Sequence, residues 1–407
     1  MLFRISHFLG GVFLVAGTAI GAGMLAIPIT TAFSGFLPSL ALLAVCWGFM
    51  LITALLFLEV NLHFKGDVNL VTMADKTLGV LGKVISWSAY LLLLYCLTAA
   101  YIAGSTPIFT SFVQEITGYQ IPRVLAPFPM LIFFGIFVYL GTRSVDLINR
   151  FFMIGLILAY ILLVIFLPSH VQLSYLSHMD LRALALGLPV VITSFGFHVI
   201  IPSLTTYMNH NRKKLTLTII IGSTLPLIVY VLWEFLILGT VPLTGENSLV
   251  SAWQEGASAT VPLMRILKNP LIGLGAHLFA FCAIITSFLG VSLSLSDFLT
   301  DGLKIKKTGG GRLIACLLTF IPPLIFVLVY QHGFILALQY AAIFVAILLG
   351  ILPALMAWTL PKKFKGFWKR CLLIAVILAS IAVIVIDLLD ENKDLSKLIE
   401  KYVNNAS

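Results

Sequence analysis

The feature that most restricts this chain is a series of unbroken apolar stretches that recur along almost its whole length. Of its 407 residues, 60% are hydrophobic and only 10% are charged, whereas a soluble domain is roughly 45–50% apolar and 25% charged. A helix needs roughly 20 apolar residues to cross a bilayer, and the strands of a membrane barrel alternate over about 10 residues. The sequence therefore predicts an all-α integral membrane protein, and it excludes a soluble enzyme, a disordered chain and a β-barrel.

Eleven membrane-spanning helices are expected, because in lipid a helix satisfies its backbone polar groups within one segment. Their expected ranges are 8–31, 36–60, 85–114, 124–142, 151–167, 181–208, 214–238, 271–300, 312–330, 334–357 and 367–388. Most of the 25 lysine and arginine residues then fall on one side of the bundle. Because basic loops stay in the cytoplasm, we expect a cytoplasmic N-terminus and a C-terminus on the other side of the membrane.

Two interrupted spans indicate an inverted repeat. The first span contains three glycines within residues 17–23, and the sixth contains Thr-Ser-Phe-Gly-Phe-His at residues 193–198. Each is the first span of a group of five, and an odd number of spans inverts the second group, which is a common plan among transporters. The predicted division is a first repeat over 1–170, a second over 171–360, and an accessory span with a polar tail over 361–407.

The interruption in the first span predicts a site for an amino acid. Glycine costs a helix interior about 1 kcal/mol relative to alanine, so three of them favour an unwound segment; close helix packing through small residues is the alternative. The N–H groups that open the following half-helix would bind a carboxylate, and carbonyl groups freed from the preceding half would accept an ammonium group or a small cation. An amino acid carries both charges.

Polar side chains at membrane depth add candidates. His198 is the ionisable residue expected near the middle of a span, where such residues usually function; a neutral histidine that fills the bundle is the alternative. Tyr101 faces either a cavity or the core. Thr286 and Ser287 offer oxygen ligands to a cation, or they bond back to their own helix. Glu234 is expected near a span end, where interfacial solvation favours a structural role.

Other chemistries find no support in the sequence. The five cysteines lie in apolar stretches without CxxC or Cys/His spacing, which indicates neither disulfides nor a metal centre. Nucleotide-binding, zinc-protease and nucleophile-elbow motifs are missing. The net charge of +9 belongs to membrane loops and does not indicate nucleic acid. We therefore expect no cofactor and no enzyme activity; a membrane enzyme, the alternative class, would show acids or histidines clustered at one leaflet.

Four motifs resemble those of one known family, and they occur in the same order. They are GTAIGAGMLAIP at 17–28, TSFGFH with the following residues to 208, residues 277–291, and TFIPPL at 319–324, similar to spans one, six, eight and nine of the bacterial hydroxy/aromatic amino acid permeases. The resemblance covers roughly residues 8–360. Segments 97–102 and 221–223 are most similar to the tyrosine-specific branch, although the tryptophan permeases share most of these motifs.

The resemblance implies the leucine-transporter-like fold, with spans 1 and 6 broken, and ion-coupled import of tyrosine across the bacterial inner membrane by alternating access. The C-terminus would then be periplasmic. A tryptophan or broad aromatic substrate range is the alternative. The implied contacts are backbone groups of Ala22, Gly23 and Met24 with Tyr101 for the carboxylate, and Ala19, Ile20, Thr193 and Ser194 for the amine. From the residues themselves we expect the aromatic ring of the substrate among Phe195, Phe197 and Tyr101, with His198 as a candidate for substrate or proton handling.

One position departs from the family pattern. A lysine follows Asn-Arg-Phe of span 5 in the tyrosine permeases, whereas Leu156 stands there in this sequence. Such a lysine can take the place of a sodium ion. The resemblance favours a proton as the coupling ion, carried by His198 or an acidic residue. The missing lysine keeps sodium as an alternative, held by oxygens of Thr286, Ser287, Ala19 and Ala22.

Overall fold

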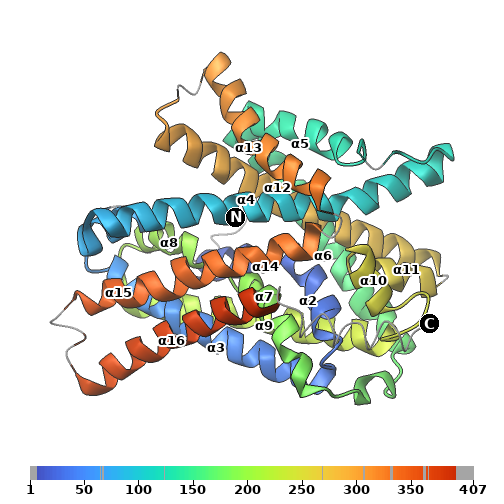
Figure 1. The fold of residues 1–407 in the computed structure, drawn as a ribbon, viewed down its shortest axis with the longest axis horizontal. Coiled ribbons are helices and arrows are strands. Elements are labelled where there is room, and N and C mark those ends of the chain that lie inside the picture. Colours follow the sequence, from blue (N-terminus) through green and yellow to red (C-terminus); the bar gives the residue numbers. More distant parts are fainter. Residues whose placement is uncertain are drawn as a thin grey trace, which may run out of the picture.

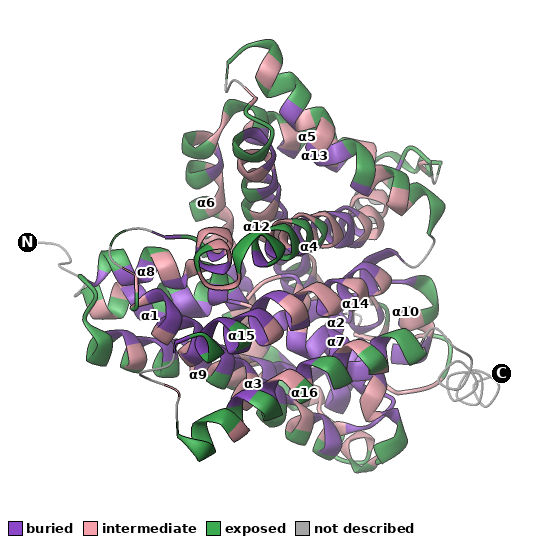
Figure 2. Ribbon diagram, turned by 60° about the vertical axis from the view of Figure 1, so that its left-hand side comes forward, coloured by how far each residue is buried: buried purple, intermediate pink, exposed green. Residues whose placement is uncertain are grey.

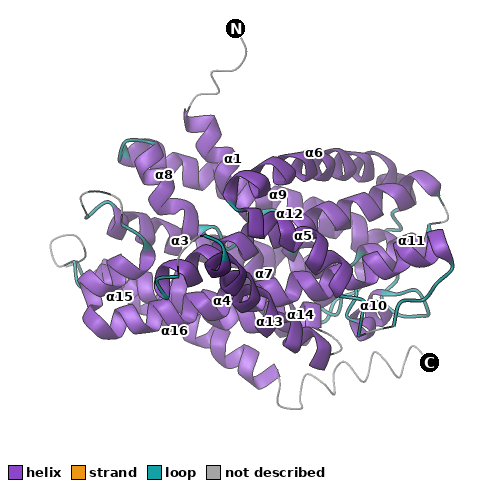
Figure 3. Cartoon of the chain, turned by 90° about the horizontal axis from the view of Figure 1, so that it is seen from above, coloured by secondary structure: helices purple, strands orange, loops and turns teal. Residues whose placement is uncertain are grey.

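A computed structural model describes residues 7–390 except 65, 67, 123, 268, 306–307, 331–332, 361–363 and 365. All regular elements in this part are helices (Figures 1 and 3). They are α1 (His7–Ala19), α2 (Gly23–Thr31), α3 (Phe36–Asn61), α4 (Leu70–Thr117), α5 (Phe128–Leu140), α6 (Thr142–Phe166), η1 (Leu167–His170), η2 (Tyr175–Ser177), η3 (Leu181–Ala183), α7 (Leu184–Ser194), η4 (His198–Ile200), α8 (Ile201–Tyr207), α9 (Arg212–Thr240), α10 (Leu249–Glu255), α11 (Thr260–Ile266), α12 (Pro270–Gly302), α13 (Gly310–Val329), α14 (Gly333–Val345), the π-helix η5 (Ala346–Ile351), α15 (Leu352–Trp358) and α16 (Phe367–Asp390).

The number of spans agrees only in part with the eleven that the sequence predicts. Nine helices in the described residues are long and apolar enough to cross a membrane, and α1 with α2 makes a tenth, bent by 53°. The expected span at 124–142 is the shorter apolar helix α5, of 13 residues. The chain is therefore a multi-pass membrane protein, and the count of eleven is not confirmed. The polar tail beyond Asp390 lies outside the described residues.

Two helices begin well before the spans predicted for them. α6 starts at Thr142, because Gly141 has a φ of 95° and both ends α5 and precedes α6. α4 starts at Leu70, where the Asn69 side chain accepts a hydrogen bond from the Thr72 N–H group. It continues through Gly79, whose φ of 69° breaks the helical backbone. Polar residues at these helix starts hid them from a search for apolar stretches.

The helices run between two ends of a bundle. The end where α9 begins and α12 ends, here called the basic end, carries Arg212, Lys213, Lys214, Lys304 and Arg312. Figure 1 shows α8 and α15 toward this end on the left, and the short helices α10 and α11 toward the opposite end on the right. The sequence predicts these five residues on one side of the membrane; that this side is cytoplasmic stays a prediction.

Burial separates central from peripheral spans. In their most apolar windows, the spans Pro270–Gly302 and Gly333–Trp358 are 61% buried, whereas Thr142–His170 and Gly310–Val329 are 22% buried. Figure 2 shows the same contrast between the purple centre and the green outer faces of α5, α6 and α13. The outer faces are apolar and lack protein cover, as expected of surfaces that meet lipid.

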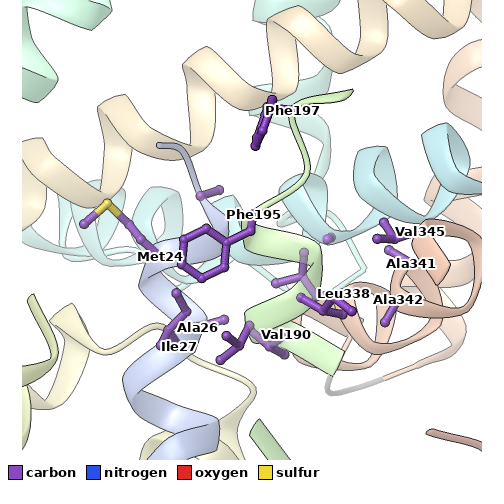
Figure 4. Packing of buried hydrophobic residues seen from close by; sticks show 14 of the residues in the cluster. Met24, Ala26, Ile27, Val190, Phe195, Phe197, Leu338, Ala341, Ala342 and Val345 are labelled. Carbon is purple, nitrogen blue, oxygen red and sulfur yellow. The ribbon is translucent and has the colours of Figure 1, made fainter. Parts of the chain in front are cut away.

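Both expected helix breaks are present. α1 ends at Ala19 and α2 starts at Gly23, while α7 ends at Ser194 and η4 starts at His198. In Figure 4, α2 and α7 lie side by side, with Phe195 near Met24, and the labelled residues of α14 lie on the other side of α7, at the right of the view. The two breaks therefore meet in the interior of the bundle, as a binding site made from broken helices requires.

Candidate functional site

A cavity of about 350 Å³ lies at the meeting point of the two breaks. Its walls come from α1, α2, α4, α6, α7, η4, α12, α14 and η5. Nine of the residues predicted from the sequence as substrate or ion contacts line it: Ala19, Ile20, Ala22, Gly23, Tyr101, Thr193, Ser194, Thr286 and Ser287. These residues are up to 268 positions apart in the sequence. They surround one cavity because the breaks in the two spans meet in the interior of the bundle.

Two glycines of the first break allow serine side chains of neighbouring helices to approach closely. A Cβ atom on Gly21 would lie 2.5 Å from Ser287 Oγ, and one on Gly23 would lie 2.6 Å from Ser194 Oγ and 3.5 Å from the Ser194 Cα atom. Real Cβ atoms essentially never come within 3.0 Å of another residue. The glycines thus let the broken first span approach α7 and α12 directly at the wall of the cavity.

The amide groups at the start of α2 are not equally available. The Ala22 N–H group donates to Ser287 Oγ over 3.0 Å, and the Met24 N–H group donates to Gly21 O over 3.2 Å. Within the described residues the Gly23 N–H group has no protein acceptor. Since unpaired N–H groups at a helix N-terminus attract anions, Gly23 presents the donor that a carboxylate in this cavity would use.

Tyr230 joins the two breaks, and the sequence did not single it out. Its hydroxyl oxygen lies 2.7 Å from Ala19 O and 2.9 Å from Ser194 O, the last carbonyl groups of α1 and α7. The side chain is fully buried in α9. A tyrosine in the middle of an apolar span was the signal available, the same signal that drew attention to Tyr101.

Four other predicted contacts are buried beside the cavity and do not line it in this conformation. Met24 and Phe197 are buried in the core, and the Phe195 ring packs against the Tyr230 ring at a centroid distance of 5.1 Å. His198 Nε2 lies 2.8 Å from Thr53 Oγ1 on α3, while its Nδ1 atom has no partner in the described part of the chain. Their roles in substrate binding remain predictions.

Glu234 differs from the expectation of a solvated residue near a span end. It is fully buried in α9, one turn beyond Tyr230, and it accepts a hydrogen bond from Thr31 Oγ1 at the end of α2. The error arose because α9 extends to Thr240 and is covered there by neighbouring helices. A buried carboxyl group needs compensation or a proton, so Glu234 joins His198 as an ionisable group inside the bundle.

The proposed cation ligands form part of the cavity wall. Thr286 Oγ1 donates to Cys282 O over 2.8 Å, the back-bonded arrangement that was the alternative interpretation, and its oxygen still has accepting capacity. Leu156 is buried on α6, which packs along α12. No cluster of three metal-binding side chains occurs among the described residues. A sodium site at Thr286 and Ser287 therefore remains a prediction.

A second cavity, of about 640 Å³, lies toward the opposite end of the bundle, between α4, α10, α13 and α14. It shares no lining residue with the cavity at the breaks. At the wall of this second cavity α4 packs tightly on α14: a Cβ atom on Gly104 would lie 2.8 Å from the Phe334 ring, and one on Gly333 would lie 3.2 Å from Ala103 Cβ. These four residues are here called the seal.

Comparisons with known proteins agree with this architecture. The family model described as tryptophan/tyrosine permease family matches residues 4–388. In solved structures, the manganese transporter of Eremococcus coleocola is similar in fold with a TM-score of 0.58, at 14% identity over 97% of this chain and 94% of that one. This likeness shows the fold, which is the expected leucine-transporter-like one.

Relatives by sequence are named as transport proteins. The "Tyrosine-specific transport system 1" of Haemophilus influenzae is 36% identical over 370 residues, which cover 88% of this chain and 91% of that protein. The "Tryptophan-specific transport protein" of the same organism is 32% identical over 88% of both chains. These relatives are transporters, so an enzyme is excluded. The family model and these relatives show, together with the fold and the paired helix breaks, that the chain belongs to the tryptophan/tyrosine permease family.

Proposed function

We propose that the protein is a secondary active transporter that imports tyrosine across the bacterial inner membrane by ion-coupled symport. The observation that carries the proposal is the cavity at the two breaks, which offers an unpaired Gly23 N–H group and converging carbonyl oxygens in one space. Tryptophan, or several aromatic amino acids, is the second candidate, since relatives of both specificities are similar to this chain.

The substrate's charged groups match the polar walls of the cavity. The carboxylate accepts from the Gly23 N–H group and from the Tyr101 hydroxyl, and the ammonium group donates to carbonyl oxygens at the ends of α1 and α7. Leu97, Leu338 and Val345 supply apolar lining for the ring. Each charged group meets an opposite helix-end partial charge, which compensates for its removal from water.

The conformation suits a site that faces the cytoplasm. From the breaks, the cavity lining extends toward the basic end through Tyr90, Asn149 and Ser294. This cavity shares no lining residue with the cavity at the opposite end, where the seal forms part of the wall. If the basic end is cytoplasmic, as lysine and arginine in loops indicate, the protein is inward-facing here. Alternating access then requires the seal to part and the basic end to close.

Competition tests the substrate class. In proteoliposomes loaded with labelled tyrosine, unlabelled tyrosine, phenylalanine and tryptophan should compete for exchange more strongly than leucine or serine. Aromatic contacts add about 0.5–1.5 kcal/mol beyond burial, so we expect a preference of roughly 2- to 10-fold over leucine. Equal competition by leucine would contradict an aromatic permease, and a higher rank for tryptophan than for tyrosine would favour the second candidate.

A further inference from the structure

The hydroxyl of Tyr230 is the protein donor to two carbonyl groups that would otherwise have none. The last four carbonyl groups of a helix lack intrahelical partners. In α1, the Ile20 N–H group satisfies Ala16 O; in α7, the N–H groups of Phe195 and Gly196 satisfy Ile192 O and Thr193 O. The described backbone offers no donor to the final carbonyl of either helix, and the Tyr230 hydroxyl alone reaches both.

One proton cannot satisfy both acceptors at once. A tyrosine hydroxyl has a single O–H donor, while Ala19 O and Ser194 O lie 2.7 and 2.9 Å from its oxygen. The C-termini of α1, with 13 residues, and α7, with 11, also converge there, and each carries a partial negative charge. The two carbonyl groups therefore have one hydrogen-bond donor too few, and the negative helix ends beside them favour a cation that brings donors.

The Tyr230 side chain is held firmly enough to organise this pair. It is fully buried, and the Phe195 ring packs against it with an interplanar angle of 57°. Its helix α9 packs along α1 and α2, so the hydroxyl is fixed relative to the first break. Both carbonyl-bearing residues line the cavity, where a bound ligand could supply the missing donor.

We propose that Tyr230 is a positioning residue that sets recognition of the substrate's α-amino group. Its hydroxyl holds the ends of α1 and α7 at a fixed separation, and the ammonium group, with three N–H donors, bonds the carbonyl that Tyr230 does not satisfy. This inference rests on the proposed transport of an amino acid. It concerns the amino group, which tyrosine and tryptophan share, and so it does not depend on which of the two is the preferred substrate.

The test compares ligands with and without the amino group. For Tyr230→Phe and the unaltered protein, exchange of labelled tyrosine is inhibited by tyrosine or by 3-(4-hydroxyphenyl)propionate, which keeps the ring and the carboxylate. In Tyr230→Phe the half-inhibiting concentration of tyrosine should rise about tenfold, while that of the analogue stays unchanged. A parallel rise for both ligands would show general damage and overturn the proposal, as would no change for either.

Tyr160→Phe is the matched control. The Tyr160 hydroxyl donates over 3.0 Å to Val229 O, a carbonyl of the same helix α9, and it touches neither break. Its removal deletes a comparable tyrosine–carbonyl bond and should leave the ratio of the two half-inhibiting concentrations at its original value. If Tyr160→Phe also raised the half-inhibiting concentration of tyrosine about tenfold and left that of the analogue unchanged, the assignment to Tyr230 would be overturned.

A measurement on the unaltered protein covers the case in which Tyr230→Phe does not fold. There the analogue should inhibit at least roughly tenfold more weakly than tyrosine, because it cannot supply the missing donor. Equal inhibition by both would overturn the proposal. If tyrosine is not exchanged at all, the proposed substrate fails, and tryptophan with 3-(indol-3-yl)propionate gives the same comparison for the amino group.

Discussion

Gly23→Leu should abolish tyrosine uptake while leaving the protein folded and inserted in the membrane. Already the first added carbon would lie 2.6 Å from Ser194 Oγ and 3.5 Å from the Ser194 Cα atom, and the rest of the side chain would fill the space that the carboxylate needs. Overpacking of this kind costs typically about 1–3 kcal/mol, less than the stability of most proteins, about 5–15 kcal/mol. Uptake into proteoliposomes, with size-exclusion profiles of the purified variant, measures both effects.

Gly48→Leu provides the control. Gly48 lies on the membrane span α3, and a Cβ atom there would have no neighbour within 4 Å. The same substitution should therefore keep uptake near its original rate. Gly21→Leu should behave like Gly23→Leu, since its Cβ atom would lie 2.5 Å from Ser287 Oγ. Normal uptake by a well-folded Gly23→Leu protein would contradict the site at the helix break.

An inwardly directed pH gradient, without sodium, should drive accumulation of tyrosine. One pH unit corresponds to 1.36 kcal/mol, so symport of one proton with each substrate allows up to about tenfold accumulation across that gradient. A sodium gradient at equal pH should drive none. The reverse result would refute proton coupling, and loss of sodium-driven uptake in Thr286→Ala plus Ser287→Ala would then place the ion. If neither gradient drives accumulation, the protein is an exchanger or a uniporter.

The proton carrier should be one of two buried groups, His198 or Glu234. Replacement of the carrier by glutamine should abolish accumulation driven by the pH gradient and retain exchange, because exchange needs no net proton movement. Glu234→Gln preserves the acceptor for Thr31 and is the milder change. Asp387→Asn is the matched control, since Asp387 is a buried acid on the accessory helix α16. Driven accumulation that survives both replacements would exclude both carriers.

Periodicity and hydropathy predicted the fold class because lipid-facing spans must be apolar throughout. Hydropathy failed to predict helix boundaries and the burial of polar residues, because neither depends on contact with lipid. The start of α6 is polar, and only the conformation of Gly141 decides where α5 ends and α6 begins. Glu234 was placed near a solvated end because the sequence does not show which helices cover the last turns of α9.

The site could be predicted where it depends on backbone and not where it depends on side-chain packing. Glycines in the first span indicated its break, and the structure gathers Ala19, Gly23 and Ser194 around one cavity. Tyr230 was missed because a single tyrosine in an apolar span looks the same whether it packs in the core or bonds two helix ends. Phe197 is buried beside the cavity in this conformation, so its contact with the substrate stays a prediction.

The seal between α4 and α14 has a consequence for how the protein responds to temperature and salt. Gly104 meets the Phe334 ring and Gly333 meets Ala103, so the close contacts of these residues are between carbon atoms. Apolar association weakens on cooling, and ionic screening acts on charges. Cold should therefore weaken the seal, whereas ionic strength should act on the other half of the transition, the closure of the basic end with its lysine and arginine residues.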